Sequence, residues 1–166
     1  MELMQWLTQT PVGKFVFTML VSMIPVAELR VGLPFGVGLG LSYPVAFTAA
    51  VLGNVLPAPF ILVYIRRVFA WLRRRFPRLG GMVDRLETKA HLKGQKVSRY
   101  KYLGLYLFVA IPLPGTGAWT GSLAAAFLDM PVRRAMPSIV LGVLTAGLIM
   151  LGLTNLGIDL FSTAIG

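Results

Sequence analysis

The chain has 166 residues, of which 56% are hydrophobic and only 13% are charged, and its formal net charge is +10. Its mean hydropathy is positive, so the composition is typical of an integral membrane protein and excludes an ordinary soluble domain. The absence of cysteine excludes disulfides, thiol catalysis and cysteine-bound metals, and the one histidine, His91, has no second ligand nearby. We therefore expect a single membrane domain over residues 1–166 that holds no metal and no cofactor.

The basic residues are concentrated between two apolar halves. Twelve of the 16 Lys and Arg residues lie between positions 66 and 101. An excess of this kind marks a cytoplasmic loop, whereas a nucleic-acid-binding protein would carry it on a folded polar module. The sequence therefore predicts a basic cytoplasmic linker over residues 66–101 and no nucleic-acid partner. Within it we expect an interfacial amphipathic helix over 66–76, whose arginines reach anionic lipid headgroups, and a cytoplasmic helix over 82–100.

Residues 14–65 and 101–152 repeat one pattern at an offset of 87 residues. Each half has an apolar run, a proline, a polar stretch, a second apolar run, another proline and a long apolar helix. The matched pairs are Lys14 and Lys101, Phe15 and Tyr102, Leu20 and Leu107, Ile24 and Ile111, Pro25 and Pro112, Pro44 and Pro131, and Val45 and Val132. We expect an ancient duplication, with repeat 1 over about 14–65 and repeat 2 over about 101–155.

The lengths of the apolar runs differ. Runs 15–27 and 102–114 have 13 residues each, which as helices cover roughly 20 Å, well short of the ~30 Å hydrocarbon core. Segments 45–65 and 135–153 are long enough to span, with kinks or ends expected at Pro57, Pro59 and Pro137.

Two arrangements of the short runs remain, a broken spanning helix in each half or a re-entrant hairpin. Hairpins return Arg133 and Arg134 to the cytoplasmic face, which the distribution of basic residues favours. The predicted fold is therefore an all-α membrane protein with an inverted-topology repeat. Each half is a re-entrant helical hairpin followed by a transmembrane helix, and both termini lie outside.

The polar stretches are the candidate site. Irregular backbone at membrane depth is tolerated only inside protein or beside a wet cavity, so the two turns should meet within the bundle. The first turn carries Glu28 and Arg30, and the second, "IPLPGTGAWTG" at 111–121, is uncharged and rich in glycine. Backbone amides in such a turn favour an anion. The candidate substrate- or ion-binding residues are Glu28, Arg30, Asn54, Gly115, Thr116, Gly117, Trp119 and Thr120.

These residues allow a functional and a structural interpretation. In the first, Arg30 and the second turn hold an anionic or polar headgroup, and Glu28 is a protonatable coupling group. In the second, Glu28 and Arg30 form an ion pair that closes the first turn, while the small residues of the second turn let helices approach. Asn54 is expected to form an interhelical hydrogen bond or to line the cavity.

Three stretches carry a resemblance to a known family: "PVAELRVGLPFGVGLGL", "GNVLPAP" and "LFVAIPLPGTGAWTGSLAAAFLDMP". They resemble the signatures of the small multidrug export family of bacterial and archaeal integral membrane proteins, over roughly residues 14–155. That family is distantly similar to the DedA (VTT-domain) superfamily, which has paired re-entrant hairpins and includes lipid transporters. The resemblance implies a prokaryotic cytoplasmic membrane location. DedA proteins typically carry an arginine motif in the second hairpin, where this chain has "GTGAWTG", so a phosphate-binding role does not transfer to that turn.

The function we expect is a proton-coupled transporter of a small amphiphilic substrate. A lipophilic cation would use Glu28 as its counter-charge, whereas an anion such as a polyprenyl-phosphate lipid or a phospholipid would be anchored by Arg30. The other class considered is a membrane scaffold that transports nothing. An enzyme is not expected, because no second carboxylate and no Ser/His pair lie near Glu28. Four helical elements are few to enclose a substrate path, which is compatible with a homodimer.

Overall fold

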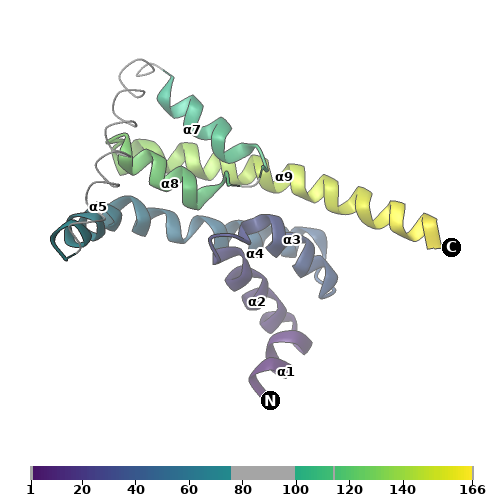
Figure 1. The fold of residues 1–166 in the computed structure, drawn as a ribbon. Coiled ribbons are helices and arrows are strands. Elements are labelled where there is room, and N and C mark those ends of the chain that lie inside the picture. Colours follow the sequence, from purple (N-terminus) through teal and green to yellow (C-terminus); the bar gives the residue numbers. More distant parts are fainter. Residues whose placement is uncertain (1, 76–99, 114, 166) are drawn as a thin grey trace.

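The computed structural model describes residues 2–75, 100–113 and 115–165, and its regular elements there are all α-helices (Figure 1). The all-α prediction is confirmed over this part of the chain. The predicted cytoplasmic helix over 82–100 lies outside the described residues except for Tyr100. The helices are α1 (Glu2–Gln9), α2 (Pro11–Met23), α3 (Glu28–Gly38), α4 (Tyr43–Val55), α5 (Pro57–Arg75), α7 (Lys101–Ala110), α8 (Ala118–Phe127) and α9 (Val132–Ile165).

Two helical segments are long and apolar enough to cross a membrane. The first, Tyr43–Ile65, comprises α4 and the start of α5, and the second, Val132–Gly157, is most of α9. Their 23 and 26 residues cover about 34 and 39 Å at the helical rise. The predicted spanning segments 45–65 and 135–153 both lie inside them. Pro57 is the first residue of α5, a position where proline is common because no helical hydrogen bond is lost. Pro137 instead lies within α9.

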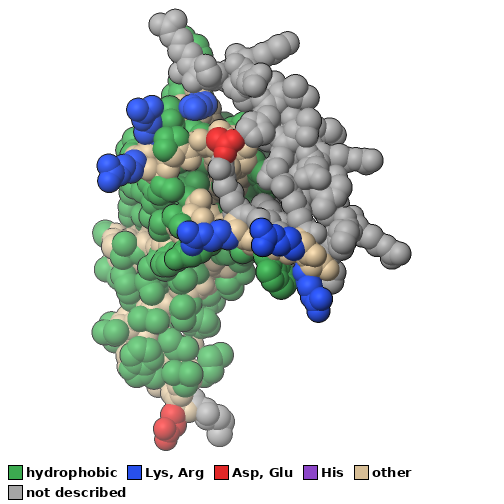
Figure 2. Space-filling model, turned by 90° about the vertical axis from the view of Figure 1, so that its left-hand side faces the viewer, with side chains coloured by type: hydrophobic (Ala, Val, Ile, Leu, Met, Phe, Trp, Pro, Cys, Tyr) green, Lys and Arg blue, Asp and Glu red, His purple; other side chains and the backbone are tan. Residues whose placement is uncertain are grey.

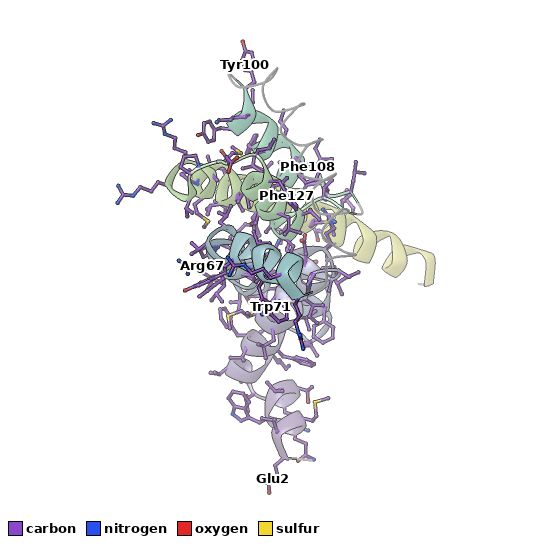
Figure 3. The ribbon with its side chains drawn as sticks, turned by 60° about the vertical axis from the view of Figure 1, so that its left-hand side comes forward. Glu2, Arg67, Trp71, Tyr100, Phe108 and Phe127 are labelled. Carbon is purple, nitrogen blue, oxygen red and sulfur yellow. The ribbon has the colours of Figure 1, made fainter. Side chains whose placement is uncertain are left out.

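The basic segment after the first spanning helix differs from the prediction. Residues 66–75 are not a separate interfacial helix but the continuation of α5 to Arg75. The reason is local, because no proline or glycine lies between residues 60 and 75 to end the helix. Figure 3 shows Arg67 and Trp71 on this helix, and the guanidinium of Arg67 lies 5.5 Å from the centroid of the Tyr64 ring.

Two pairs of short helices, α2 with α3 and α7 with α8, pack against each other in the two halves. In both pairs the first helix ends at an isoleucine with extended backbone, Ile24 (φ −70°, ψ 129°) and Ile111 (φ −80°, ψ 118°). Each isoleucine precedes a proline, whose ring disfavours helical backbone in the residue before it. These two helix ends are 87 residues apart, the offset at which the sequence pattern recurs.

Beyond the turns the equivalent positions are 89 residues apart. The α3–α4 and α8–α9 connections use the same backbone hydrogen bonds and the same left-handed residue, Gly40 (φ +85°) or Asp129 (φ +53°). In the first connection the N–H groups of Leu39, Gly40 and Leu41 donate to the carbonyl oxygens of Phe35, Val37 and Gly36, in that order. In the second connection the N–H groups of Leu128, Asp129 and Met130 donate to those of Ala124, Ala126 and Ala125. The second turn is thus two residues longer, so Pro131 corresponds to Ser42 and not to Pro44.

Each spanning helix approaches its own helix pair at a glycine. A Cβ on Gly53 in α4 would lie 2.1 Å from the carbonyl oxygen of Met19, and one on Gly142 in α9 would lie 3.0 Å from that of Tyr106. Met19 and Tyr106 are 87 residues apart, and the two glycines are 89 apart. The same close helix packing therefore occurs in both halves.

Gly53→Ala is expected to lower the free energy of unfolding by about 1–3 kcal/mol, because the new methyl group would overlap a backbone oxygen that moves only with α2. Gly152→Ala in α9 is the matched control, since a Cβ there meets nothing within 4 Å and alanine is the better helix former. Thermal unfolding in detergent measures both. Equal midpoints for the two variants would contradict the close approach of α2 and α4.

The packing follows a pattern that is common in helical membrane proteins. Many fully buried residues are alanines, which let helices approach closely: Ala46, Ala49, Ala50, Ala58, Ala118, Ala125, Ala135 and Ala146. Large apolar side chains such as Phe60, Leu107 and Leu148 are instead exposed. Figure 2 shows a face dominated by hydrophobic side chains, with a group of Lys and Arg side chains where α5 ends and α9 begins.

Candidate functional site

Glu28 stands out in the first turn. It is the first residue of α3, only 3% of its surface is exposed, and its φ of +48° is left-handed. Left-handed backbone costs a residue with a side chain about 1–2 kcal/mol, so the surrounding contacts must hold it there.

The carboxylate of Glu28 contacts the second turn. Its Oε1 accepts a hydrogen bond from the backbone N–H of Trp119 at 3.2 Å. Trp119 is the second residue of α8, where the backbone N–H groups have no acceptor within their own helix. The positive end of the helix dipole also favours a carboxylate at this position. A side chain of the first half therefore caps a helix of the second half.

Gly117 makes room for that carboxylate. A Cβ at this position would lie 1.8 Å from Oε2 of Glu28, and the backbone φ is +143°. Glycine is required here both for its conformation and for its missing side chain.

Arg30 also contacts the second turn. Its Nη2 donates to the backbone carbonyl oxygen of Thr116 and, at 2.8 Å, to the Thr116 hydroxyl. That hydroxyl also lies within hydrogen-bond distance of the carbonyl oxygens of Ile111 (2.6 Å) and Leu113 (2.8 Å), so Thr116 holds its own turn together. The guanidinium has five N–H donors, and these bonds use those of one nitrogen only.

The contacts between the turns are reciprocal. The indole Nε1 of Trp119 donates to the backbone carbonyl oxygen of Met23 at 3.0 Å, just before the first turn. At the offset of 89, Trp119 is the equivalent of Arg30, and each sends a side-chain N–H to a carbonyl of the opposite turn. Glu28 and Gly117 are also equivalent positions, and they are in contact.

The expectation that the two turns meet is confirmed by these hydrogen bonds. The hydrogen bonds of Glu28 and Arg30 go to the second turn. The two side chains also attract each other electrostatically, so both the functional and the structural interpretation stay open. The carbonyl of Met23 was not predicted, because a backbone acceptor leaves no signal in the sequence.

Two of the candidate residues do not reach the first turn. Gly115 (φ +82°) is exposed, and a Cβ there would meet open space. The hydroxyl of Thr120 bonds to the carbonyl of Gly117 at 3.5 Å, within its own helix. The structure therefore brings together five of the candidates: Glu28, Arg30, Thr116, Gly117 and Trp119.

Asn54 is buried in α4. It is 1% exposed, and neither atom of its amide has a hydrogen-bond partner in the described part of the chain, so the predicted interhelical bond is not formed there. Its neighbour Gly53 packs against Met19 and Ser22, and Ser22 directly precedes Met23, which bonds to Trp119. The hydroxyl of Ser122 is likewise buried without a partner, and the sequence did not single it out.

The described residues include no group of three or more His, Cys, Asp or Glu side chains that would hold a metal ion. The site contains one buried carboxylate, one guanidinium whose hydrogen bonds to described residues use a single nitrogen, and the amides of a helix N-terminus.

Comparison with known proteins places the chain in a family. The family model described as "Putative small multi-drug export protein" matches residues 28–149, about three quarters of the chain, including Glu28, Arg30, the second turn, Gly53 and Gly142. The searches of curated proteins and of solved structures gave no match. The two helices of spanning length agree with a membrane protein family. The chain therefore belongs to the family of small multi-drug export proteins.

Proposed function

We propose that this protein is a proton-coupled membrane transporter that moves a small amphiphilic molecule, with the two turns as its substrate site. The observation that carries the proposal is the contact of Glu28 and Arg30, from one half, with residues 116–119 of the other. Ionisable side chains inside a membrane are costly and mark substrate or ion pathways by default. The family description, that of an exporter, points in the same direction.

An inverted repeat is the topology that accounts for this meeting. Helices α2 and α7 have 13 and 10 residues, about 20 and 15 Å, so neither crosses the hydrocarbon core. We propose that α2–α3 and α7–α8 are re-entrant hairpins that enter from opposite sides and meet near the midplane. The recurring turn bonds and glycine contacts support the duplication. Transporters built from inverted repeats have their sites at such an interface.

The exposed basic residues suggest the orientation. Arg67, Arg74 and Arg75 on α5 and Arg133 and Arg134 on α9 are exposed, and these ends lie on the same side of the molecule (Figures 1 and 2). Basic residues favour the cytoplasmic side, where they also contact anionic lipid headgroups. We therefore propose a prokaryotic cytoplasmic membrane location with the linker 66–101 inside and both termini outside. A homodimer would complete the enclosure of the substrate path.

Protonation of Glu28 is the proposed coupling step. The ionised carboxylate is a strong acceptor for the Trp119 N–H and is stabilised by the α8 dipole, whereas the neutral carboxyl gains little from either. Binding a proton therefore weakens one of the contacts that join the halves. A lipophilic cation would exchange with that proton, because both are counter-charges for the same carboxylate.

A lipid transporter similar to DedA proteins is the second candidate, and the state of Arg30 favours it. Arg30 is only partly buried and keeps donors that Thr116 does not use. A guanidinium of this kind binds phosphate groups well. The substrate would then be a polyprenyl phosphate or a phospholipid, anchored by Arg30.

The thermal stability of the purified protein in liposomes distinguishes these functions. The ligands are tetraphenylphosphonium, as a lipophilic cation, and a polyprenyl phosphate, and the variants are Glu28→Gln and Arg30→Ala. A ligand at 100 times its Kd adds about 2.7 kcal/mol of stability. Stabilisation by the cation that is lost in Glu28→Gln supports the exporter, and stabilisation by the phosphate that is lost in Arg30→Ala supports the lipid transporter.

Arg134→Ala is the matched control, because it removes an exposed arginine outside the site. It should keep every ligand shift of the wild type. The absence of any shift in the wild type would favour the membrane scaffold over both transporters.

A further inference from the structure

Two buried polar side chains of the core, one in each half, have apolar residues at their equivalent positions in the other half. At the offset of 89, Asn54 corresponds to Val143 and Ser122 corresponds to Leu33. All four side chains are fully buried, with Asn54 1% exposed and the other three 0%. The turn hydrogen bonds and the glycine contacts, by contrast, recur in both halves. The apolar pair shows that the fold itself does not need polar groups at these positions.

Asn54 lies on the face of α4 that packs against α9. A Cβ on Gly147 in α9 would meet the side chains of Phe47 and Val51, so this face of α4 is turned toward α9. Asn54 follows Phe47 by seven residues and Val51 by three, which puts it on the same face. Its side chain is therefore on the face of α4 that contacts α9.

Ser122 belongs to α8, a helix of the second half that contacts α4. It lies on the buried face of α8 with Ala118 and Ala125, one helical turn beyond Trp119, whose N–H binds Glu28. Helix α8 packs against α4, α5 and α9. Two polar side chains without a hydrogen-bond partner among the described residues thus belong to contacting helices of opposite halves, and Ser122 lies one helical turn behind the capped end of α8.

Buried polar atoms nearly always have a partner, and where the protein supplies none an internal water commonly does. We propose that Asn54 and Ser122 hold one or more internal water molecules behind Glu28. We further propose, on the basis of the proposed function, that this water carries the proton to the carboxylate. A hydronium ion formed in the aqueous phase passes its proton along the water to Glu28, which becomes a neutral carboxyl, and a neutral water remains.

A crystal structure grown in a lipid mesophase tests the water site directly. We expect non-protein density about 2.7–3.2 Å from the Asn54 amide and the Ser122 hydroxyl, and we expect it to be lost in Asn54→Val/Ser122→Ala. A direct hydrogen bond between the two side chains with no density beside them would overturn the site.

Thermal unfolding gives an independent test of the same site. Replacing a hydrated polar pair by apolar groups of similar shape should leave the midpoint nearly unchanged, whereas removing an amide that has no partner should raise it. A clear rise in Asn54→Val/Ser122→Ala, with none in Thr48→Val, would overturn the water site. Thr48 is the matched control because its hydroxyl is exposed on the same helix.

Voltage-driven proton influx into liposomes tests the second part. Loss of influx in Asn54→Val/Ser122→Ala supports the proton route, and influx at the wild-type rate overturns it. Glu28→Gln separates the proposed function from the water site. Unchanged proton influx in that variant would contradict the proposed function, whereas the water site is still decided by the crystallographic density beside Asn54 and Ser122.

Discussion

Proton-driven transport is expected to fall to background in Glu28→Gln while the protein stays folded. Glutamine has the shape of glutamate, so its side-chain oxygen still accepts the Trp119 N–H and its amide still fits beside Gly117. It takes up no proton, however, so the coupling step is removed. The measurement is substrate-driven acidification of liposomes that contain the purified variant.

The thermal midpoint of Glu28→Gln shows whether the fold survives. Losing the charge at the N-terminus of α8 should cost about 0.3–1 kcal/mol, which lowers the midpoint by roughly 1–4 °C. Glu2→Gln is the matched control, because Glu2 is exposed in α1 and should change neither flux nor midpoint. Normal proton-coupled flux in Glu28→Gln would remove this carboxylate from the mechanism.

Gly117→Ala is expected to separate the two turns. The new Cβ would lie 1.8 Å from Oε2 of Glu28, so the carboxylate must leave and its cap on α8 is lost, at a cost of about 0.5–2 kcal/mol. The backbone φ of +143° adds strain of about 1–3 kcal/mol for alanine. Thermal unfolding should therefore show a loss of about 2–5 kcal/mol, and transport should fall with it.

Two further variants isolate the steric part of this effect. Gly115→Ala carries backbone strain at φ +82° but meets nothing, so it should cost clearly less than Gly117→Ala. In a Glu28→Ala background the clash is absent, so Gly117→Ala should be less harmful there than in the wild type. Coupling energies of 0.5–3 kcal/mol are usual for side chains in contact, and strict additivity would mean that the two residues do not touch.

The amino-acid sequence by itself determined the class of protein and the places where its helices stop. Composition specifies a membrane protein, because lipid requires long apolar helices. Pro25 and Pro112 fix the ends of α2 and α7 through the residues that precede them, which is a local steric effect. Irregular backbone at membrane depth must be covered by protein, and this requirement predicts that the two turns meet.

Only the tertiary structure decided which atoms meet there. Glu28 binds a backbone N–H 91 residues away and Arg30 binds Thr116, so neither pairing depends on its neighbours in the chain. The register of the second repeat also changes by two residues, because the longer second turn carries Gly117 to its place beside Glu28. The sequence also did not reveal that Asn54 and Ser122 are buried without partners among the described residues, because helical periodicity gives the face on which a residue lies but not what covers that face. These features follow from distances between segments far apart in the chain, which local preferences do not contain.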